Sequence, residues 1–160
     1  MLSRCSFTRL GILCAIGLAT AACAETDPEI VAIEYLRATR ESRSDAAIGY
    51  LDMDELVGRV ANDIVLVNTD GDADDFLRES VSSLIWALFQ ETPREDLAYD
   101  ARPADITGDR ATVRVTTANA EGRERTRDVH LRHTDSGWLV SGRSLNDLVR
   151  YVITRLEERY

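Results

Sequence analysis

Two histidines stand three residues apart and are the first candidates for proton chemistry. His130 and His133 lie in a run of alternating polar and apolar residues, a pattern typical of a strand. Side chains alternate between the two faces of a strand, so this spacing prevents the histidines from chelating one ion together. His133 falls on the predicted core face near Trp138, where it could act as a general base opposite Asp100 or Tyr99. The alternative is a histidine at a strand end whose hydrogen bonds are already satisfied.

An acidic segment before the longest predicted helix carries oxygen ligands at the spacing of a calcium-binding loop. Ala73 stands where that loop needs glycine for its sharp turn, and Asp75 where it needs a buried aliphatic residue. A solvated acidic helix cap is therefore the favoured interpretation, and we predict no metal and no cofactor. The candidate calcium ligands, should the segment bind the ion, are Asn68, Asp70, Asp72, Asp74 and Glu79.

Several aromatic side chains could line an apolar cavity, although such residues more often belong to a core. The predicted pocket residues are Tyr35, Trp86, Tyr99 and Trp138. The sequence contains no glycine-rich phosphate loop, no serine nucleophile elbow and no histidine-rich metal motif. A non-enzymatic role is therefore favoured over a catalytic one.

The first 23 residues have the parts of a bacterial signal peptide. Arg4 and Arg9 precede an apolar core at residues 10–19, which is too short to span a bilayer comfortably. The segment Thr20-Ala21-Ala22-Cys23 resembles a lipobox, in which Cys23 would be lipidated, whereas Ala22-Cys23-Ala24 fits ordinary signal peptidase. We favour a lipoprotein anchored in the cell envelope and facing the periplasm. The alternative is a soluble periplasmic or secreted protein.

Residues 24–160 are predicted to form one domain, because this length suits a single hydrophobic core. All three cysteines lie in the leader, so the domain has no disulfide and no thiol nucleophile. The net charge of −9 argues against nucleic acid as a partner, since phosphate binding needs a dense basic surface. The acids gather before residue 100, and the later residues are mildly basic.

Helices are predicted on both sides of a sheet-forming segment. One helix begins at Pro28 with Ile30, Ile33 and Leu36 on its apolar face, and two short helices follow within residues 46–60. A long helix over about residues 75–90 has an apolar stripe that starts at Phe76, with Trp86 off the stripe. A final amphipathic helix begins after Ser144.

The segment 111–141 predicts three antiparallel strands joined by two turns. A three-residue loop ending at Gly122 would set Val113 opposite Val129 and keep both apolar faces together. A two-residue loop at Ser136-Gly137 is expected next. The predicted core face carries Val113, Val115, Val129, Leu131 and Trp138, and the opposite, wet face carries Arg114, His130 and Arg132. Residues 97–106 predict one further strand, with Pro103 at an edge or bulge.

Short fold signatures resemble the nuclear-transport-factor-2-like (cystatin-like, α+β cone) domains of small secreted bacterial lipoproteins. They are Asp27-Pro28-Glu29-Ile30-Val31 with Tyr35-Leu36, Asp45-Ala46-Ala47, the run from Gly108 to Val115, and the run from Asp135 to Val140. The resemblance implies an α+β fold with N-terminal helices on a curved antiparallel sheet around a cone-shaped cavity. The predicted C-terminal helix departs from it. Members bind apolar ligands or lipids, catalyse isomerase or dehydratase reactions, or form dimers, and the fold alone does not choose.

Three functions follow as hypotheses. The first is an envelope-anchored, non-enzymatic domain that holds a small apolar or lipid-like ligand between sheet and helices. The second is a small isomerase-like or dehydratase-like enzyme that uses His133. The third is a structural partner in an envelope complex that docks by its acidic helical face. The partners considered are a second copy of the chain, as a homodimer, and another envelope protein.

Overall fold

The computed structural model describes residues 26–64 and 73–158, so the predicted signal peptide, Cys23 and most of the acidic calcium-loop segment lie outside the described residues. The helices are α1 (Pro28–Arg40), α2 (Ser44–Gly49), α3 (Met53–Asp63), α4 (Ala73–Glu91) and α5 (Asn146–Glu157), with a short 3-10 turn η1 (Gly142–Leu145) before α5. The strands are β1 (Ala98–Ala101), β2 (Asp105–Thr107), β3 (Arg110–Ala118), β4 (Glu124–Thr134) and β5 (Gly137–Val140). None of the described helices is long and apolar enough to cross a membrane.

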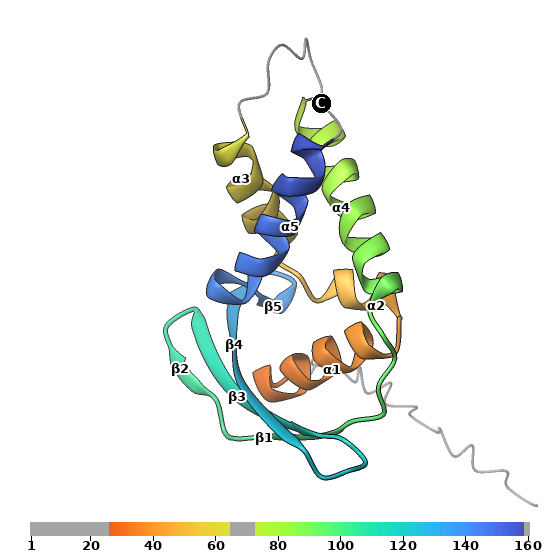
Figure 1. The fold of residues 1–160 in the computed structure, drawn as a ribbon. Helices are drawn as coiled ribbons and strands as arrows, with labels where there is room; N and C mark the ends of the chain where they lie inside the picture. The colour runs from red at the N-terminus through yellow and green to blue at the C-terminus, as the bar shows by residue number, and fades with distance from the viewer. Residues whose placement is uncertain (1–25, 65–72, 159–160) are drawn as a thin grey trace, which may run out of the picture.

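The fold is α+β, with α1 lying in the concavity of a curled antiparallel sheet and α3, α4 and α5 grouped beyond β5 (Figure 1). The strand order is β1-β3-β4-β5, and β2 pairs with the same edge of β3 as β1. Helices before a curled meander are what the NTF2-like resemblance implies, so the predicted fold class is confirmed. Helix α5 follows the last strand, as the sequence predicted.

The β3–β4 hairpin has the predicted register. Val113 lies opposite Val129, and the backbone N–H of Gly122 donates to the carbonyl of Asn119 at 2.9 Å. Gly122 has a φ of 75°, a left-handed conformation that favours glycine at the end of a three-residue loop. The prediction of this loop is confirmed.

Two predictions about the remaining turns need correction. Thr134 lies opposite Gly137, so the β4–β5 loop is Asp135-Ser136 rather than Ser136-Gly137. Trp138 still shares a face with Leu131, because moving the loop by one residue at each strand end leaves the alternation unchanged. The single strand predicted over residues 97–106 is divided into β1 and β2, with Pro103 in the break on the sheet edge, where no ladder hydrogen bond is lost.

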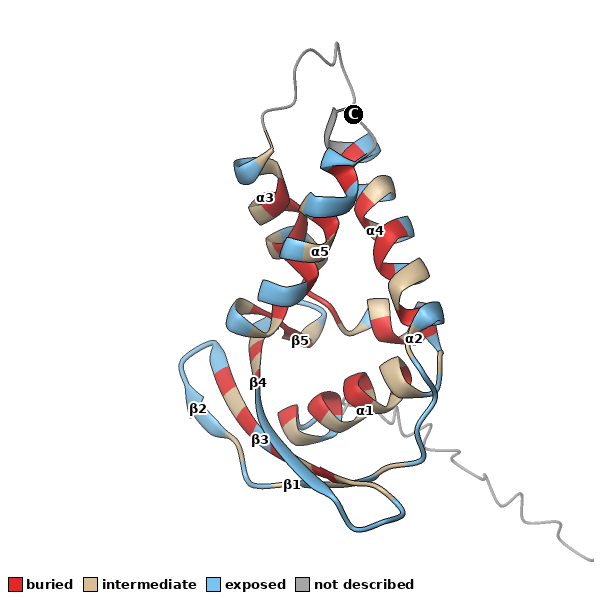
Figure 2. Cartoon of the chain, viewed as in Figure 1, coloured by how far each residue is buried: buried red, intermediate tan, exposed pale blue. Residues whose placement is uncertain are grey.

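One core joins the concave sheet face to the helices, as the buried residues in Figure 2 show. Two residues predicted to be in this core are exposed, Ile30 at 51% and Phe76 at 49%. Phe76 heads a helical row that continues with Ser80 and Ser83, and Ile30 heads one that continues with Glu34. Each therefore faces away from the apolar stripe of its helix. Trp86 is exposed, in agreement with its predicted place off the stripe.

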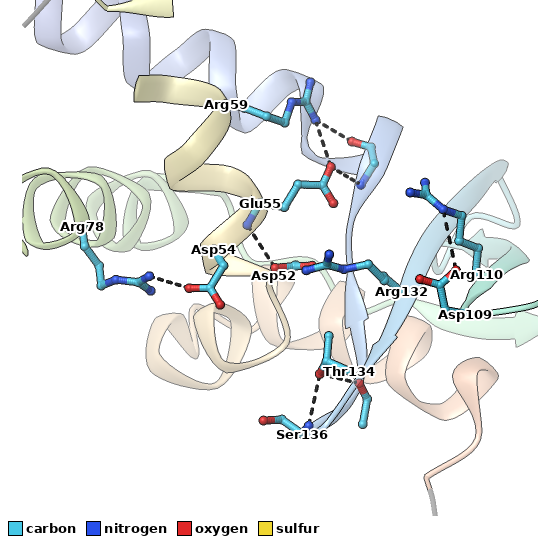
Figure 3. A network of polar contacts seen from close by, with 12 residues as sticks. Asp52, Asp54, Glu55, Arg59, Arg78, Asp109, Arg110, Arg132, Thr134 and Ser136 are labelled. Atoms are coloured by element: carbon cyan, nitrogen blue, oxygen red, sulfur yellow. Dashed lines mark hydrogen bonds and ion pairs between the residues drawn. The ribbon is translucent and has the colours of Figure 1, made fainter. Parts of the chain in front are cut away.

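A polar junction connects α3 to β4 and to the start of α5 (Figure 3). The buried carboxylate of Asp52 accepts a hydrogen bond from the backbone N–H of Glu55 and lies 2.5 Å from the guanidinium of Arg132. Glu55 accepts from the backbone N–H of Gly142 at 3.0 Å, and Arg59 donates to the Gly142 carbonyl at 2.7 Å. The junction thus fixes the helical group against the end of the sheet.

The junction also corrects the prediction of a wet face. Arg132 and His130 are only partly exposed, because Asp52 at the start of α3 pairs with Arg132 and η1 packs on β4. His130 Nδ1 lies 3.1 Å from the hydroxyl of Thr112, and the His130 backbone N–H donates to Ser144. Arg114, farther along the sheet, is exposed as predicted.

Candidate ligand-binding site

The concave face of β4 changes from apolar to basic along its length. Leu131 and Val129 are buried in the core, and the next two residues on the same face are Arg127 and Arg125. The register sets Arg127 opposite Val115 of β3, and Arg125 opposite Thr117. The same face of β4 is therefore apolar where it joins the core and basic toward the β3–β4 loop.

At this transition a hollow of about 640 Å³ lies between α1, β4 and the η1–α5 segment. Its apolar lining consists of Tyr35, Leu36, Val129 and Leu148, and its basic lining consists of Arg125, Arg127 and Arg143. The apolar residues are buried, whereas the three arginines are exposed. The hollow therefore combines an apolar floor with a cationic border.

The cationic border is not neutralised by ion pairs within residues 26–64 and 73–158. None of the side chains of Arg125, Arg127 and Arg143 forms an ion pair with a residue that the structure describes. Of the two acids in the lining, Asp128 is bound by Arg114 at 2.8 and 3.3 Å, and these hydrogen bonds lower the pKa of its carboxyl group. Asp147 is the remaining acid, so positive charge is in excess.

Tyr35 is the most buried polar side chain in the lining of the hollow, with 8% of its surface exposed. Burial raises the pKa of its phenol to about 12, the charge of nearby Arg127 acts to lower it, and that of Asp147 acts to raise it. The phenol is thus neutral at physiological pH. Its ring packs edge-on against Phe89, with 6.5 Å between ring centroids.

A second hollow, of about 170 Å³, adjoins the first and shares Arg125 and Arg127 with it. Arg40 of α1 also lines it, but Arg40 is paired with Glu95 at 3.6 Å. On this side burial raises the pKa of Tyr99, and the charges of Arg37, Arg40 and Arg127 act to lower it. Arg127 therefore acts electrostatically on both Tyr35 and Tyr99.

The structure distributes the four predicted pocket aromatics over several places. Tyr35 lines the main hollow, whereas Tyr99 lines another one with Arg40 and with Arg37, whose guanidinium lies 5.4 Å from the centre of the Tyr99 ring. Trp138 lines a separate hollow of about 540 Å³ together with His133, and Trp86 is exposed on α4. Tyr35 is the one member of the predicted set that lines the main hollow.

His133 lies far from the acid and the tyrosine proposed to face it. It is opposite Trp138, whose ring it meets edge-on at 5.0 Å between centroids. Asp100 and Tyr99 pair with Thr116 and Thr117, at the other end of the sheet. The predicted pairing of His133 with Asp100 or Tyr99 is therefore wrong, because the strand register separates them along the length of β4. Asp135 is the acid that lines the hollow of His133.

The arginines of the main hollow were missed by sequence reasoning. The signal was present, because Arg125 and Arg127 follow Val129 at alternate positions toward the hairpin loop. Within the residues that the structure describes, no group of three His, Cys, Asp or Glu side chains could hold a metal ion. Glu79 is exposed on α4, and the other predicted calcium ligands lie outside the part whose side chains are described.

Comparison with known proteins finds similar folds but no close relative. No family model and no curated protein matches the sequence. An NTF2-like transpeptidase from Campylobacter jejuni is similar in structure, with a TM-score of 0.47 and 16% identity over 72% of this chain and 97% of that one. A phospholipid-binding protein from Ralstonia solanacearum, solved with a phospholipid, has a TM-score of 0.49 and 13% identity over 84% of this chain and 97% of that one. Both are too distant to carry a statement about activity or ligand.

Proposed function

We propose that the chain is an envelope-anchored, non-enzymatic domain that binds a small amphipathic anion in the hollow between α1, β4 and α5. The observation that carries the proposal is the apolar floor bordered by three arginines that form no ion pair with the described residues. A ligand with an apolar body and an anionic group satisfies both parts of this lining. The volume of the hollow, about 640 Å³, lies in the range of roughly 300–1,000 Å³ that small-molecule sites occupy.

The physical balance favours an amphipathic ligand over a purely apolar or a purely ionic one. Covering the apolar floor removes hydrocarbon surface from water, which stabilises the complex by about 25 cal/mol per Å². Exposed arginines add attraction for an anion and increase the association rate, in a manner that salt weakens. A free inorganic anion would use the arginines but leave the floor uncovered.

The proposed anchor is a lipid on Cys23, which precedes α1 by only a few residues. The support is the apolar leader and its lipobox-like end. Growing cells that express the full chain with radioactive palmitate should label it, and Cys23→Ala should abolish the label. Absence of label from the unaltered chain, or label that survives in the variant, would contradict the lipoprotein proposal.

Ligand binding is tested by extracting residues 24–160, purified from cells, with organic solvent. Mass spectrometry should detect an amphipathic anion, and a fluorescent fatty acid should then bind the extracted domain at one site. His133→Ala should bind this fatty acid with unchanged affinity, because His133 lines a different hollow. A domain that binds no fatty acid contradicts the proposal and favours a structural partner, and a strong loss in His133→Ala moves the site to the other hollow.

A further inference from the structure

We infer that the anionic group of the ligand is held inside the hollow by the Tyr35 hydroxyl and Arg127, with its apolar body directed toward α5. This inference rests on the proposed function and specifies the ligand as a carboxylate or a phosphate monoester on an apolar chain. It makes Tyr35 a specificity-determining residue. The alternative is a head group bound by the exposed arginines alone, without contact to the Tyr35 hydroxyl.

The first support is that the Tyr35 hydroxyl has no hydrogen-bond partner in the described part of the chain. Tyr35 is more than nine-tenths buried and lines the hollow, yet its hydroxyl forms no hydrogen bond with any residue that the structure describes. The oxygen itself is not enclosed, because it is not among the enclosed side-chain atoms of the described residues that lack a hydrogen-bond partner. A hydroxyl donor that opens onto the hollow without a partner among the described residues can donate to an acceptor on a ligand.

The second support is the charge around this hydroxyl. Arg127 acts on Tyr35 electrostatically and has no ion pair among the described residues. A neutral phenol and a guanidinium both offer donors, so together they suit an acceptor-only group such as an ionised carboxylate or phosphate. A cationic or donor-rich head group would not match them.

The third support is the position of Asp147 in the first turn of α5. Its negative charge also acts on Tyr35, from the α5 side of the hollow. An anion is repelled by Asp147 and attracted by Arg127, so the head group is directed toward β4. The apolar residues Leu36 and Leu148 remain for the chain. The lining thus favours one orientation of the ligand.

The test is calorimetry of the mature domain with dodecanoate, dodecyl phosphate and dodecanol. Both anions should bind more tightly than dodecanol, and the tighter of the two identifies the head group as carboxylate or phosphate. Tyr35→Phe should lower the affinity for the preferred anion about tenfold, because a hydrogen bond to a charged group is lost. The affinity for dodecanol should stay unchanged, because the substitution leaves the volume of the hollow nearly the same. Tyr151→Phe, on the partly exposed Tyr151 of α5, is the matched control and should change neither affinity.

The outcomes separate the inference from the proposed function. If dodecanoate binds and Arg143→Ala weakens it while Tyr35→Phe does not, the head group lies at the border and the inference is overturned, but the proposed function stands. If no dodecyl compound binds, the proposed function fails and the inference fails with it. Thermal unfolding of each variant confirms that it is folded before its affinity is compared.

Discussion

Replacement of Asp52 by alanine is expected to lower the free energy of unfolding by about 3 kcal/mol. Asp52 is 1% exposed, caps α3 and lies 2.5 Å from Arg132. Its loss leaves the partly buried guanidinium unpaired and removes the cap of α3, which by itself is worth about 1 kcal/mol. Because the side chain of Arg132 is 36% exposed, water can solvate the guanidinium once Asp52 is removed. The expected loss of stability therefore lies at the low end of the range for buried ion pairs. Urea unfolding of the mature domain measures it.

Two variants control this prediction. Asp54→Ala breaks an ion pair of the same 2.5 Å length with Arg78, but that carboxylate is 80% exposed, so the change should be below about 1 kcal/mol. Asp52→Asn retains an oxygen for the N–H of Glu55 and should destabilise less than Asp52→Ala. Equal losses in Asp52→Ala and Asp54→Ala would show that burial of Asp52 does not govern the junction.

The double variant Arg125→Ala/Arg127→Ala is expected to bind dodecanoate about 100-fold more weakly than the unaltered domain. Each arginine offers a charge-assisted contact to the anion, and neither contributes an ion pair to the described fold. The free energy of unfolding should therefore change by less than about 1 kcal/mol. This variant should therefore lose affinity while it keeps its stability, whereas Asp52→Ala should lose stability.

The matched control replaces Arg110 and Arg150, two exposed arginines outside the main hollow. This variant removes the same net charge, so it reports the long-range electrostatic effect alone. Its affinity for dodecanoate should fall by less than about threefold at physiological ionic strength, where the Debye length is about 8 Å. Equal losses in the two double variants would show that net charge, and not the hollow, attracts the anion.

The sheet could be predicted from sequence because its signals are local. Alternation around Val113 and Val129, with Gly122 in the loop, admits one register that keeps both apolar faces together, and that register is present. Pro103 likewise predicted an edge. The β4–β5 loop was misplaced by one residue because moving it changes no face. Ile30 and Phe76 were misassigned because a broad helical stripe does not define its own borders.

The candidate site could not be predicted in the same way, because its parts come from segments far apart in the sequence. Tyr35 belongs to α1, Arg127 to β4 and Asp147 to α5. Each segment alone indicates only a helix or a strand. The partial burial of His130 and Arg132 was missed for the same reason, since it depends on Asp52 and Ser144 meeting β4. The choice between a wet and a covered face is made by tertiary packing.

The central claim is that the hollow between α1, β4 and α5 binds an amphipathic anion. Backbone amide NMR of the ¹⁵N-labelled mature domain during titration with dodecanoate tests it most directly. The account predicts saturable shifts at Tyr35 and Leu36, along residues 125–129 and along residues 143–148. No shift at these amides, or shifts confined to Tyr50, His133 and Trp138 around the other hollow, would contradict it.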